Sequence, residues 1–202
     1  MTDIFRVRYK VYCLERGYER ADDYPDGLEH DEYDPYSMHF IAYLNSSPVG
    51  TVRLILENPF GFPVERYCNA DLKTICPTAD RIAEISRLAV SYQAVKGCAV
   101  ERSKITLGLI RELYYTSREV NIRYLVSAMS KSLDRLLNRC GMSFIKAGLP
   151  VDYHGLRTPY YASCDDLERE VFNRRRDIFQ FLFPKETGAL PGASLIINAS
   201  NR

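Results

Sequence analysis

Several residue types are scarce or missing, and each shortage excludes a class of protein. Tryptophan is absent and histidine occurs only three times, at positions whose spacing does not fit a set of metal ligands. The six cysteines form no C-x-x-C pair, which excludes a zinc site or a thioredoxin-like redox motif, and we interpret them as reduced thiols. No apolar run is long enough to span a bilayer, and the first residues form no export signal. We therefore expect a cytoplasmic protein with no membrane span and no metal.

An excess of charge of either sign is also missing. Lysine and arginine number 27 against 26 for aspartate and glutamate, which leaves a net charge of +1 and argues against a general nucleic-acid binder. Hydrophobic residues make up 46% of the 202 positions, enough to build one core. We find no linker or repeat, so we expect a single domain over residues 1–202.

The hydrophobic periodicity predicts alternating helices and strands. Apolar residues at i, i+3 and i+7 indicate a helix over 4–17, and an acidic loop follows over 20–37. Strands are predicted over 39–44, 49–56, 81–90, 124–129, 143–149 and 193–198, and a Pro/Gly-rich loop over 59–77. Further helices are predicted over 100–120, from a cap at Ser130 to a stop at Gly141, and over 167–182. Strands come before and between the helices, with hairpins early, so we expect a mixed α/β fold.

Five short motifs follow one another in the first 87 residues. They are an R-x-x-x-Y motif, an aromatic residue six positions on, a D-x-x-D motif, a G-T-V-R motif and an E-x-x-R motif. Their defining residues are Arg8 and Tyr12, Tyr18, Asp31 and Asp34, Arg53, and Glu84 and Arg87. This order and spacing resembles the signature of autoinducer (acyl-homoserine-lactone) synthases, although Tyr12 and Tyr18 stand where that family usually has Phe and Trp.

Longer segments resemble a narrower group. RYKVYCLERGYE, DEYDPYSMHFIA, AEISRLAVS and DYHGLRTPYY are similar to acyltransferases associated with PEP-CTERM/exosortase systems and to N-acyl amino acid synthases. The resemblance implies a GNAT-like fold, a three-layer α/β/α sandwich, and direct acyl transfer without a covalent enzyme intermediate. GNAT proteins begin with a strand, whereas this chain begins almost at its first helix.

The resemblance also bears on the acyl donor. The GNAT pyrophosphate loop, Q/R-x-x-G-x-G/A, is not matched by the nearest segment, Gln93 to Ala99. This favours the acyl-phosphopantetheine of an acyl carrier protein over acyl-CoA as donor, with no bound cofactor. Carrier proteins are acidic, so a basic face is expected on the enzyme. We predict carrier contacts at Lys96, Arg102 and Lys104, with basic runs at 131–139 and 174–176 as the alternatives.

The chemistry requires a base near the attacking amine and donors near the carbonyl oxygen, which becomes negative in the transition state. Glu84 is the candidate base, directly or through a water, with Arg87 beside it. Strict alternation would place these two residues on opposite faces of a strand, so the prediction needs a bulge, which the GNAT fold implies. The alternative is a structural ion pair.

Further residues are predicted to bind substrate. By resemblance, Arg8, Asp31, Asp34, Arg53 and Arg87 form an ion-pair network that orders the N-terminal region over the acceptor; fold maintenance is the alternative. Tyr12 and Tyr18 are predicted to line a pocket, with core packing as the equal alternative. Ser86, next to Arg87, and His154, in a polar turn, complete the set.

These inferences favour an N-acyltransferase that moves a fatty acyl group from acyl carrier protein to the amine of a small acceptor such as an amino acid. An acyl-homoserine-lactone synthase that uses S-adenosylmethionine is the alternative enzyme. A non-catalytic carrier-binding or ligand-binding module on the same fold is the alternative from another class.

Overall fold

The computed structural model describes residues 1–76, 81–98, 100–183 and 195–200. Its internal contacts divide the chain into two compact units. Unit 1 consists of Met1–Leu54, Arg87–Tyr115 and Gly188–Arg202, and unit 2 of Ile55–Ser86 and Thr116–Thr187. The single-domain expectation stays a prediction.

Unit 1 begins with the predicted N-terminal helix. It consists of α1 (Thr2–Tyr9) and a π-helical continuation, η1 (Lys10–Glu15). Its apolar stripe is buried, as at Ile4, Val7 and Val11, and Gly17 ends the helical run with a left-handed φ of +62°. The 4–17 helix is therefore confirmed. The loop that follows contains two 3₁₀ turns, η2 (Ala21–Asp23) and η3 (Asp34–Tyr36).

The strands of unit 1 carry its core. β1 (Ser37–Leu44) and β2 (Ser47–Ile55) form the predicted hairpin, and both turn residues, Asn45 and Ser46, have positive φ, as such turns require. The hydrogen-bonded order is β8–β1–β2–β3, in which β8 (Leu195–Ser200) runs antiparallel to β1. β3 (Ile82–Val90) gives unit 1 its residues from Arg87 onward.

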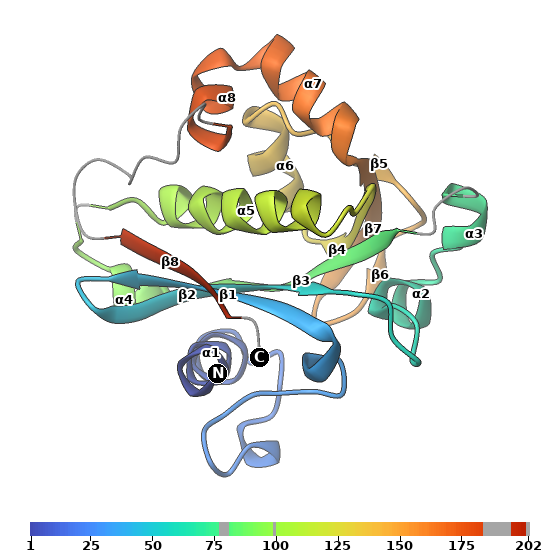
Figure 1. Cartoon of the computed structure of the whole chain (residues 1–202). Helices are drawn as coiled ribbons and strands as arrows, with labels where there is room; N and C mark the ends of the chain where they lie inside the picture. The colour runs from blue at the N-terminus through green and yellow to red at the C-terminus, as the bar shows by residue number, and fades with distance from the viewer. Residues whose placement is uncertain (77–80, 99, 184–194, 201–202) are drawn as a thin grey trace. The chain divides into compact units, whose positions relative to one another are not determined.

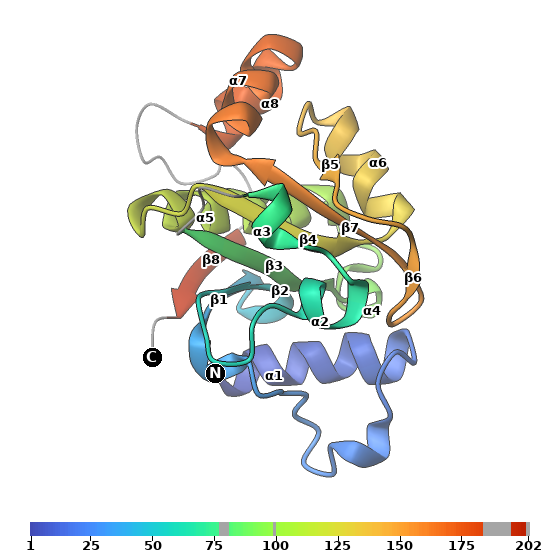
Figure 2. The same ribbon diagram turned by 90° about the vertical axis from the view of Figure 1, so that its right-hand side faces the viewer.

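Helices cover both faces of this hairpin. Figures 1 and 2 show α1 on one face of β1 and β2 and α5 (Arg102–Glu119) on the other. Between β3 and α5 lies the short helix α4 (Tyr92–Val95). Because both faces are covered, β2 is buried almost continuously from Val49 onward. The central residues are fully buried: Phe40, Val52, Leu54, Ile105 and Leu109.

Unit 2 is built around β4 (Tyr124–Met129). The first residues of β3 run parallel to β4, and β7 (Leu156–Ser163) runs antiparallel to it on the other side. β7 also pairs with the short strands β5 (Ile145–Lys146) and β6 (Val151–Asp152). The remaining elements are helices: α2 (Pro63–Cys68), α3 (Leu72–Ile75), α6 (Lys131–Arg139), α7 (Cys164–Arg174) and α8 (Arg176–Leu182). Residues of α2 and α3 pack on Val126 of β4.

Several predicted elements are confirmed in position, and others need correction. The 59–77 loop contains α2 and α3 up to Cys76, while Pro77 lies outside the described residues. Only Ile145–Lys146 of the predicted 143–149 strand is extended as a strand, and β7 was not predicted. The 167–182 helix is two helices, because Arg175 leaves the helical region with φ −145° and ψ 80°. The last strand begins at Leu195, and residues 193 and 194 lie outside the described part.

The fold class is confirmed. A parallel β3–β4 pair and antiparallel pairs elsewhere make a mixed sheet, and helices alternate with the strands. Within the described residues, no helix combines the length and the apolar character needed to cross a membrane.

Candidate active site

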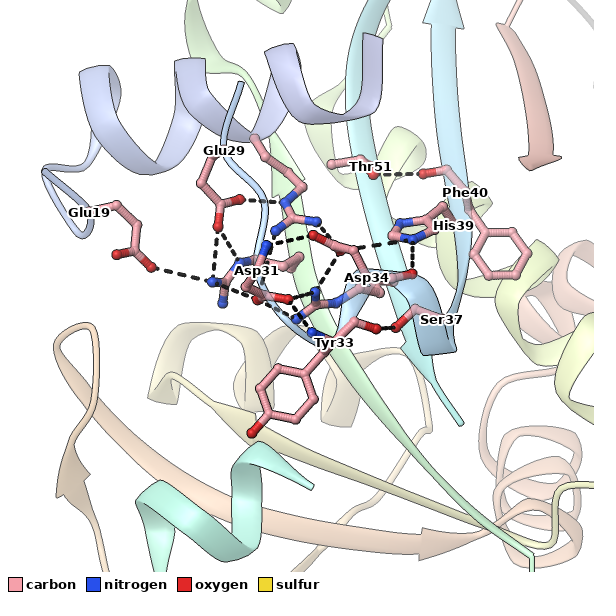
Figure 3. Close-up of polar contacts among 12 residues, drawn as sticks. Glu19, Glu29, Asp31, Tyr33, Asp34, Ser37, His39, Phe40 and Thr51 are labelled. Atoms are coloured by element: carbon pink, nitrogen blue, oxygen red, sulfur yellow. Dashed lines mark hydrogen bonds and ion pairs between the residues drawn. The ribbon is translucent and has the colours of Figure 1, made fainter. Parts of the chain in front are cut away.

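Unit 1 contains a cluster of three arginines and four carboxylates, which we call the arginine–carboxylate cluster. Figure 3 shows the carboxylates converging from the loop between η1 and β1. Its members are Arg8 of α1, Arg53 of β2, Arg87 of β3, and Glu19, Glu29, Asp31 and Asp34. Three positive and four negative charges leave an excess of one negative charge. All five residues of the predicted network are members, and the predicted ion pairs are present, while their role toward substrates stays a prediction.

Arg8 is the most deeply buried cation of the cluster, with no exposed side-chain surface. Its Nε donates to Glu29 Oε2, and its Nη1 donates to Asp34 Oδ1 at 2.5 Å. Its Nη2 lies 3.8 Å from Asp31 Oδ2. One guanidinium thus fixes three carboxylates of the acidic loop against α1.

Arg53 holds the D-x-x-D motif onto β2. Its Nη1 donates to Asp31 Oδ1 and, at 2.6 Å, to Asp34 Oδ1, and its Nη2 donates to Asp31 Oδ2 at 2.9 Å. The motif is closed on itself, because the Asp31 N–H donates to Asp34 Oδ2 at 2.7 Å. A charge on this apolar strand needs a carboxylate partner, and the two aspartates supply it.

Arg87 joins the cluster from a strained position in β3. Its φ of +50° is a left-handed conformation that costs a non-glycine residue roughly 1–2 kcal/mol. Its Nε donates to Glu29 Oε1 at 3.1 Å, and its Nη2 lies 3.1 Å from Asp31 Oδ2 and 3.3 Å from Glu19 Oε1. The backbone therefore breaks from regular strand geometry at Arg87, and ion pairs hold the side chain in place. The bulge that would turn Glu84 and Arg87 to one side stays a prediction.

The electrostatics of the cluster keep its carboxylates ionised. Burial raises the pKa of Glu29, but the charges of Arg8 and Arg87 outweigh it and lower that pKa to about 2. Burial likewise opposes ionisation of Asp31, and Arg53 then holds its pKa well below the ordinary value. Burial lowers the pKa of Arg8, whereas Glu29 and Asp34 raise it to a net value above the usual range. Each buried charge is therefore stabilised by its partners.

His39 lies beside the cluster as a neutral ring. Its Nε2 lies 3.2 Å from the Asp34 carbonyl oxygen, which assigns the proton to Nε2. Burial lowers the pKa of His39 below its ordinary value despite the nearby Asp34 carboxylate. A buried, neutral ring that contacts a backbone carbonyl is typical of a structural histidine.

The two predicted pocket tyrosines contact each other and the cluster. Tyr12 and Tyr18 make an edge contact with ring centroids 6.0 Å apart, and the Arg87 guanidinium lies 5.2 Å from the centre of the Tyr12 ring. Tyr12 also packs on the apolar group formed by Val7, Val11 and Ala89. Both the packing role and the pocket role remain open to Tyr12, and its substrate contact stays a prediction.

Glu84, the candidate base, is a buried carboxylate in unit 2 with 1% of its surface exposed. The N–H of Val64, in the first turn of α2, donates to Glu84 Oε2 at 2.9 Å. The parallel register of β3 with β4 covers Ile82 to Glu84, and the next carbonyl, that of Ile85, accepts from the Ser127 hydroxyl at 2.8 Å. A buried carboxylate oriented by a backbone donor, at the end of a regular ladder, is suited to accept a proton.

The other predicted residues lie at more exposed positions. Ser86 is half-buried on β3, and His154, also half-buried, lies in the turn between β6 and β7 with φ +51°. The His154 ring contacts that of Tyr153, which stacks on Tyr67 of α2. Lys96, Arg102 and Lys104 are exposed near α4 and the start of α5. Within the described ranges, no group of three His, Cys, Asp or Glu side chains could hold a metal ion.

Glu19 and Glu29 belong to the cluster but were not predicted as site residues. Glu29 is fully buried and binds both Arg8 and Arg87. Neither residue belongs to one of the five motifs, so nothing in the sequence distinguishes it from the exposed carboxylates nearby.

Comparisons with known proteins identify relatives of this chain. The model of a family described as "N-acyl amino acid synthase FeeM" matches residues 3–163. An acyl-homoserine-lactone synthase from Aeromonas salmonicida is 24% identical over 153 residues, which cover 73% of this chain and 70% of that protein.

Solved structures share the fold. The structure of FeeM, an N-acyl amino acid synthase from uncultured soil microbes, aligns with a TM-score of 0.65 at 15% identity and covers 83% of this chain and 86% of that one. BjaI, a CoA-dependent acyl-homoserine lactone synthase solved with SAM and isopentyl-CoA, aligns with a TM-score of 0.62 at 22% identity, covering 90% and 79%. The expected GNAT-like acyltransferase fold is confirmed, while the exosortase association stays a prediction. The family match spans both the arginine–carboxylate cluster and Glu84, and the chain therefore belongs to the N-acyl amino acid synthase FeeM family of acyltransferases.

Proposed function

We propose that this enzyme transfers a fatty acyl group from the thioester of an acyl carrier protein to the amine of an amino acid. The observation that carries the proposal is the family match over residues 3–163, because it contains every member of the cluster and Glu84. The buried, oriented carboxylate of Glu84 supports the chemistry independently.

In the proposed reaction, Glu84 accepts a proton from the acceptor amine, directly or through one water. The amine nitrogen forms a bond to the thioester carbonyl carbon, whose oxygen becomes negative. Backbone N–H groups of β3 beyond Glu84 serve as donors to that oxygen, which the break at Arg87 supports. Collapse of the intermediate breaks the C–S bond, and the released thiolate takes up the proton. The products are an amide and a free pantetheine thiol.

A carrier-bound donor is supported by the start of α4. Backbone N–H groups at the start of a helix bind phosphate well, but here a side chain occupies them. Glu15 accepts from the Tyr92 N–H at 2.9 Å and the Gln93 N–H at 3.4 Å, and Ser91 Oγ accepts from the Ala94 N–H at 3.1 Å. A carboxylate in this place disfavours the pyrophosphate of coenzyme A.

The base assignment is tested with Glu84→Gln. Glutamine keeps an oxygen for the Val64 N–H but cannot accept the proton, so we expect kcat to fall by roughly 10²–10⁴-fold. Thiol release in a stopped or continuous colour assay measures the rate, and thermal unfolding confirms that the variant is folded. Glu57→Gln, at an exposed glutamate of unit 2, is the matched control and should keep full rate. Full turnover by Glu84→Gln would show that Glu84 is not the base.

An acyl-homoserine-lactone synthase is the second candidate, favoured by the Aeromonas salmonicida relative. Mass spectrometry of products separates the two. The enzyme is incubated with mixed acyl carrier proteins and a pool of amino acids and S-adenosylmethionine. An N-acyl amino acid supports the proposal, and an acyl-homoserine lactone supports the second candidate. Absence of thiol release with every donor and acceptor would support a binding module instead.

A further inference from the structure

Unit 1 has a half-open cavity of about 590 Å³ at the C-terminal end of η1. Its walls come from η1, from the start of α4 and from the first residue of α5. The residues that matter here are three cations, Lys10, Arg16 and Arg102, one carboxylate, Glu15, and two large exposed side chains, Leu14 and Tyr92. None of them belongs to the arginine–carboxylate cluster.

The cations of this cavity interact with one carboxylate, Glu15, only at a distance longer than a salt bridge. Across the described ranges, Lys10, Arg16 and Arg102 form no ion pair with a carboxylate at salt-bridge distance. Glu15 is engaged elsewhere, since it accepts from the Ser91 hydroxyl at 2.5 Å and from the N–H groups of Tyr92 and Gln93. Partial desolvation and the nearby charge of Arg16 lower the pKa of Arg102, although the charge of Glu15 opposes them. Two guanidiniums that repel each other would be stabilised by an anion bound between them.

Apolar surface lies next to these charges. Leu14 is 64% exposed and Tyr92 is 52% exposed, although both line the cavity. A site for a small inorganic anion needs no such surface. Cations beside exposed leucine and tyrosine suit a protein partner that presents acidic residues around an apolar contact.

The cavity is also hydrogen-bonded to the end of the strand of the candidate site. Glu15 accepts from the hydroxyl of Ser91, the residue that follows β3, and this contact joins two walls of the cavity. Tyr92 lies five residues beyond Arg87, which limits the separation of their backbones to at most about 17 Å. An extended phosphopantetheine arm can span such a separation.

We propose that this cavity is the docking site for the acidic face of the acyl carrier protein. The inference rests on the proposed function and specifies its partner's contact surface. It moves the predicted carrier contacts toward η1, because Arg102 lines the cavity whereas Lys96 and Lys104 are not among its lining residues. Lys10 and Arg16, which were not predicted as carrier contacts, are proposed contacts in their stead.

The test measures binding of apo carrier protein, which has no pantetheine arm, by titration calorimetry or biolayer interferometry. The double charge reversal Arg16→Glu/Arg102→Glu should weaken binding by roughly tenfold or more. The neutral version, Arg16→Gln/Arg102→Gln, serves if the reversal fails to fold. Lys131→Glu/Arg135→Glu, at two exposed cations of α6, makes the same charge change and should alter Kd less than about twofold.

A second measurement compares donors. The ratio of kcat/KM for acyl carrier protein to kcat/KM for free acyl-pantetheine should fall by about the same factor as binding. Three results would overturn the proposal. The α6 control could weaken carrier binding as much as the cavity variant does, or the cavity variant could leave the Kd unchanged. Free coenzyme A could also displace apo carrier from the enzyme. If the wild type binds carrier but transfers no acyl group, the proposed function fails and the docking site stands.

Discussion

At the scale of single residues, Glu29 is the carboxylate that links α1 to β3. It has no exposed surface and each of its oxygens binds a different arginine. In Glu29→Gln the charges of Arg8 and Arg87 lose a buried partner, so we expect the free energy of unfolding to fall by about 3–5 kcal/mol. Urea denaturation followed by circular dichroism measures it.

The control for that experiment is again Glu57→Gln, which removes an exposed carboxylate and should change the free energy of unfolding by less than about 0.5 kcal/mol. Equal stability of the Glu29→Gln variant and the wild type would mean that the cluster contributes little net stability.

The same residues predict how stability depends on pH. The pKa of Glu29 falls from 4.5 to about 2 on folding, and that of Asp31 also falls. The unfolded chain therefore takes up these protons first, and stability that is full above about pH 4.5 is lost as the pH falls toward 2. The pKa of His39 is also lower in the folded chain than its ordinary value of 6.5. Protonation of His39 therefore also reduces stability as the pH falls below about 6.5. Unfolding free energies measured from pH 7 to pH 3 should fall slightly at first and then steeply, and the steep part should be smaller in Glu29→Gln.

Five members of the cluster were predictable because their residue types and spacing resemble the signature of the autoinducer synthases. Arg53 could also be argued physically, since a cation on the apolar face of β2 needs a carboxylate. Glu29 and Glu19 carry no such signal, because the acidic loop has no periodicity and its buried carboxylates look like its exposed ones. Glu15 was missed for the same reason: only the folded chain brings it to Ser91.

At the scale of elements, β2 passes very close to β3 and α5 at Gly50. A Cβ atom there would lie 3.1 Å from the Ala89 carbonyl oxygen, 3.1 Å from Val90 Cγ2 and 3.3 Å from Leu109 Cδ1. Since a backbone oxygen cannot move aside alone, we expect Gly50→Ala to destabilise the protein by about 1–3 kcal/mol. The midpoint of thermal unfolding measures the effect, and Ser47→Ala at the exposed start of β2 should leave it unchanged. An unshifted Gly50→Ala midpoint would show that the strands separate at little cost.

Elements with clear periodicity or caps were predictable, and the others were not. β4 was placed at its observed bounds, and α6 begins at Ser130, whose hydroxyl accepts from the Leu133 N–H at 3.3 Å. The Pro and Gly residues around α2 predict a loop. Pro63, however, stands at the first helical position of α2, where proline is favoured. β7 contains Pro159, which lowered its strand signal. Tertiary pairing with β4 outweighs that local preference.

At the scale of the whole molecule, two elements run through both compact units. β3 is divided between Ser86 and Arg87, and α5 between Tyr115 and Thr116. Unfolding of either unit removes part of these elements from the other, so we expect one cooperative transition. Because tryptophan is absent, one introduced tryptophan reports the unfolding of its own unit by fluorescence. The two variants are Tyr18→Trp in unit 1 and Tyr67→Trp in unit 2. Their urea midpoints should coincide, and separate midpoints would contradict the single-domain prediction.

The members of the arginine–carboxylate cluster are synthesised at different times, because the ribosome makes the chain from its N-terminus. Arg8 and the four carboxylates emerge first, as one positive against four negative charges, and Arg53 and Arg87 come later. At about 5–20 residues per second, the stretch from Arg53 to Arg87 takes about 2–7 s to synthesise. During that interval the nascent acidic loop carries uncompensated charge and cannot be buried. We therefore expect the N-terminal segment, although it is made first, to pack only after β3 has been synthesised, and to be accessible to proteases and chaperones until then.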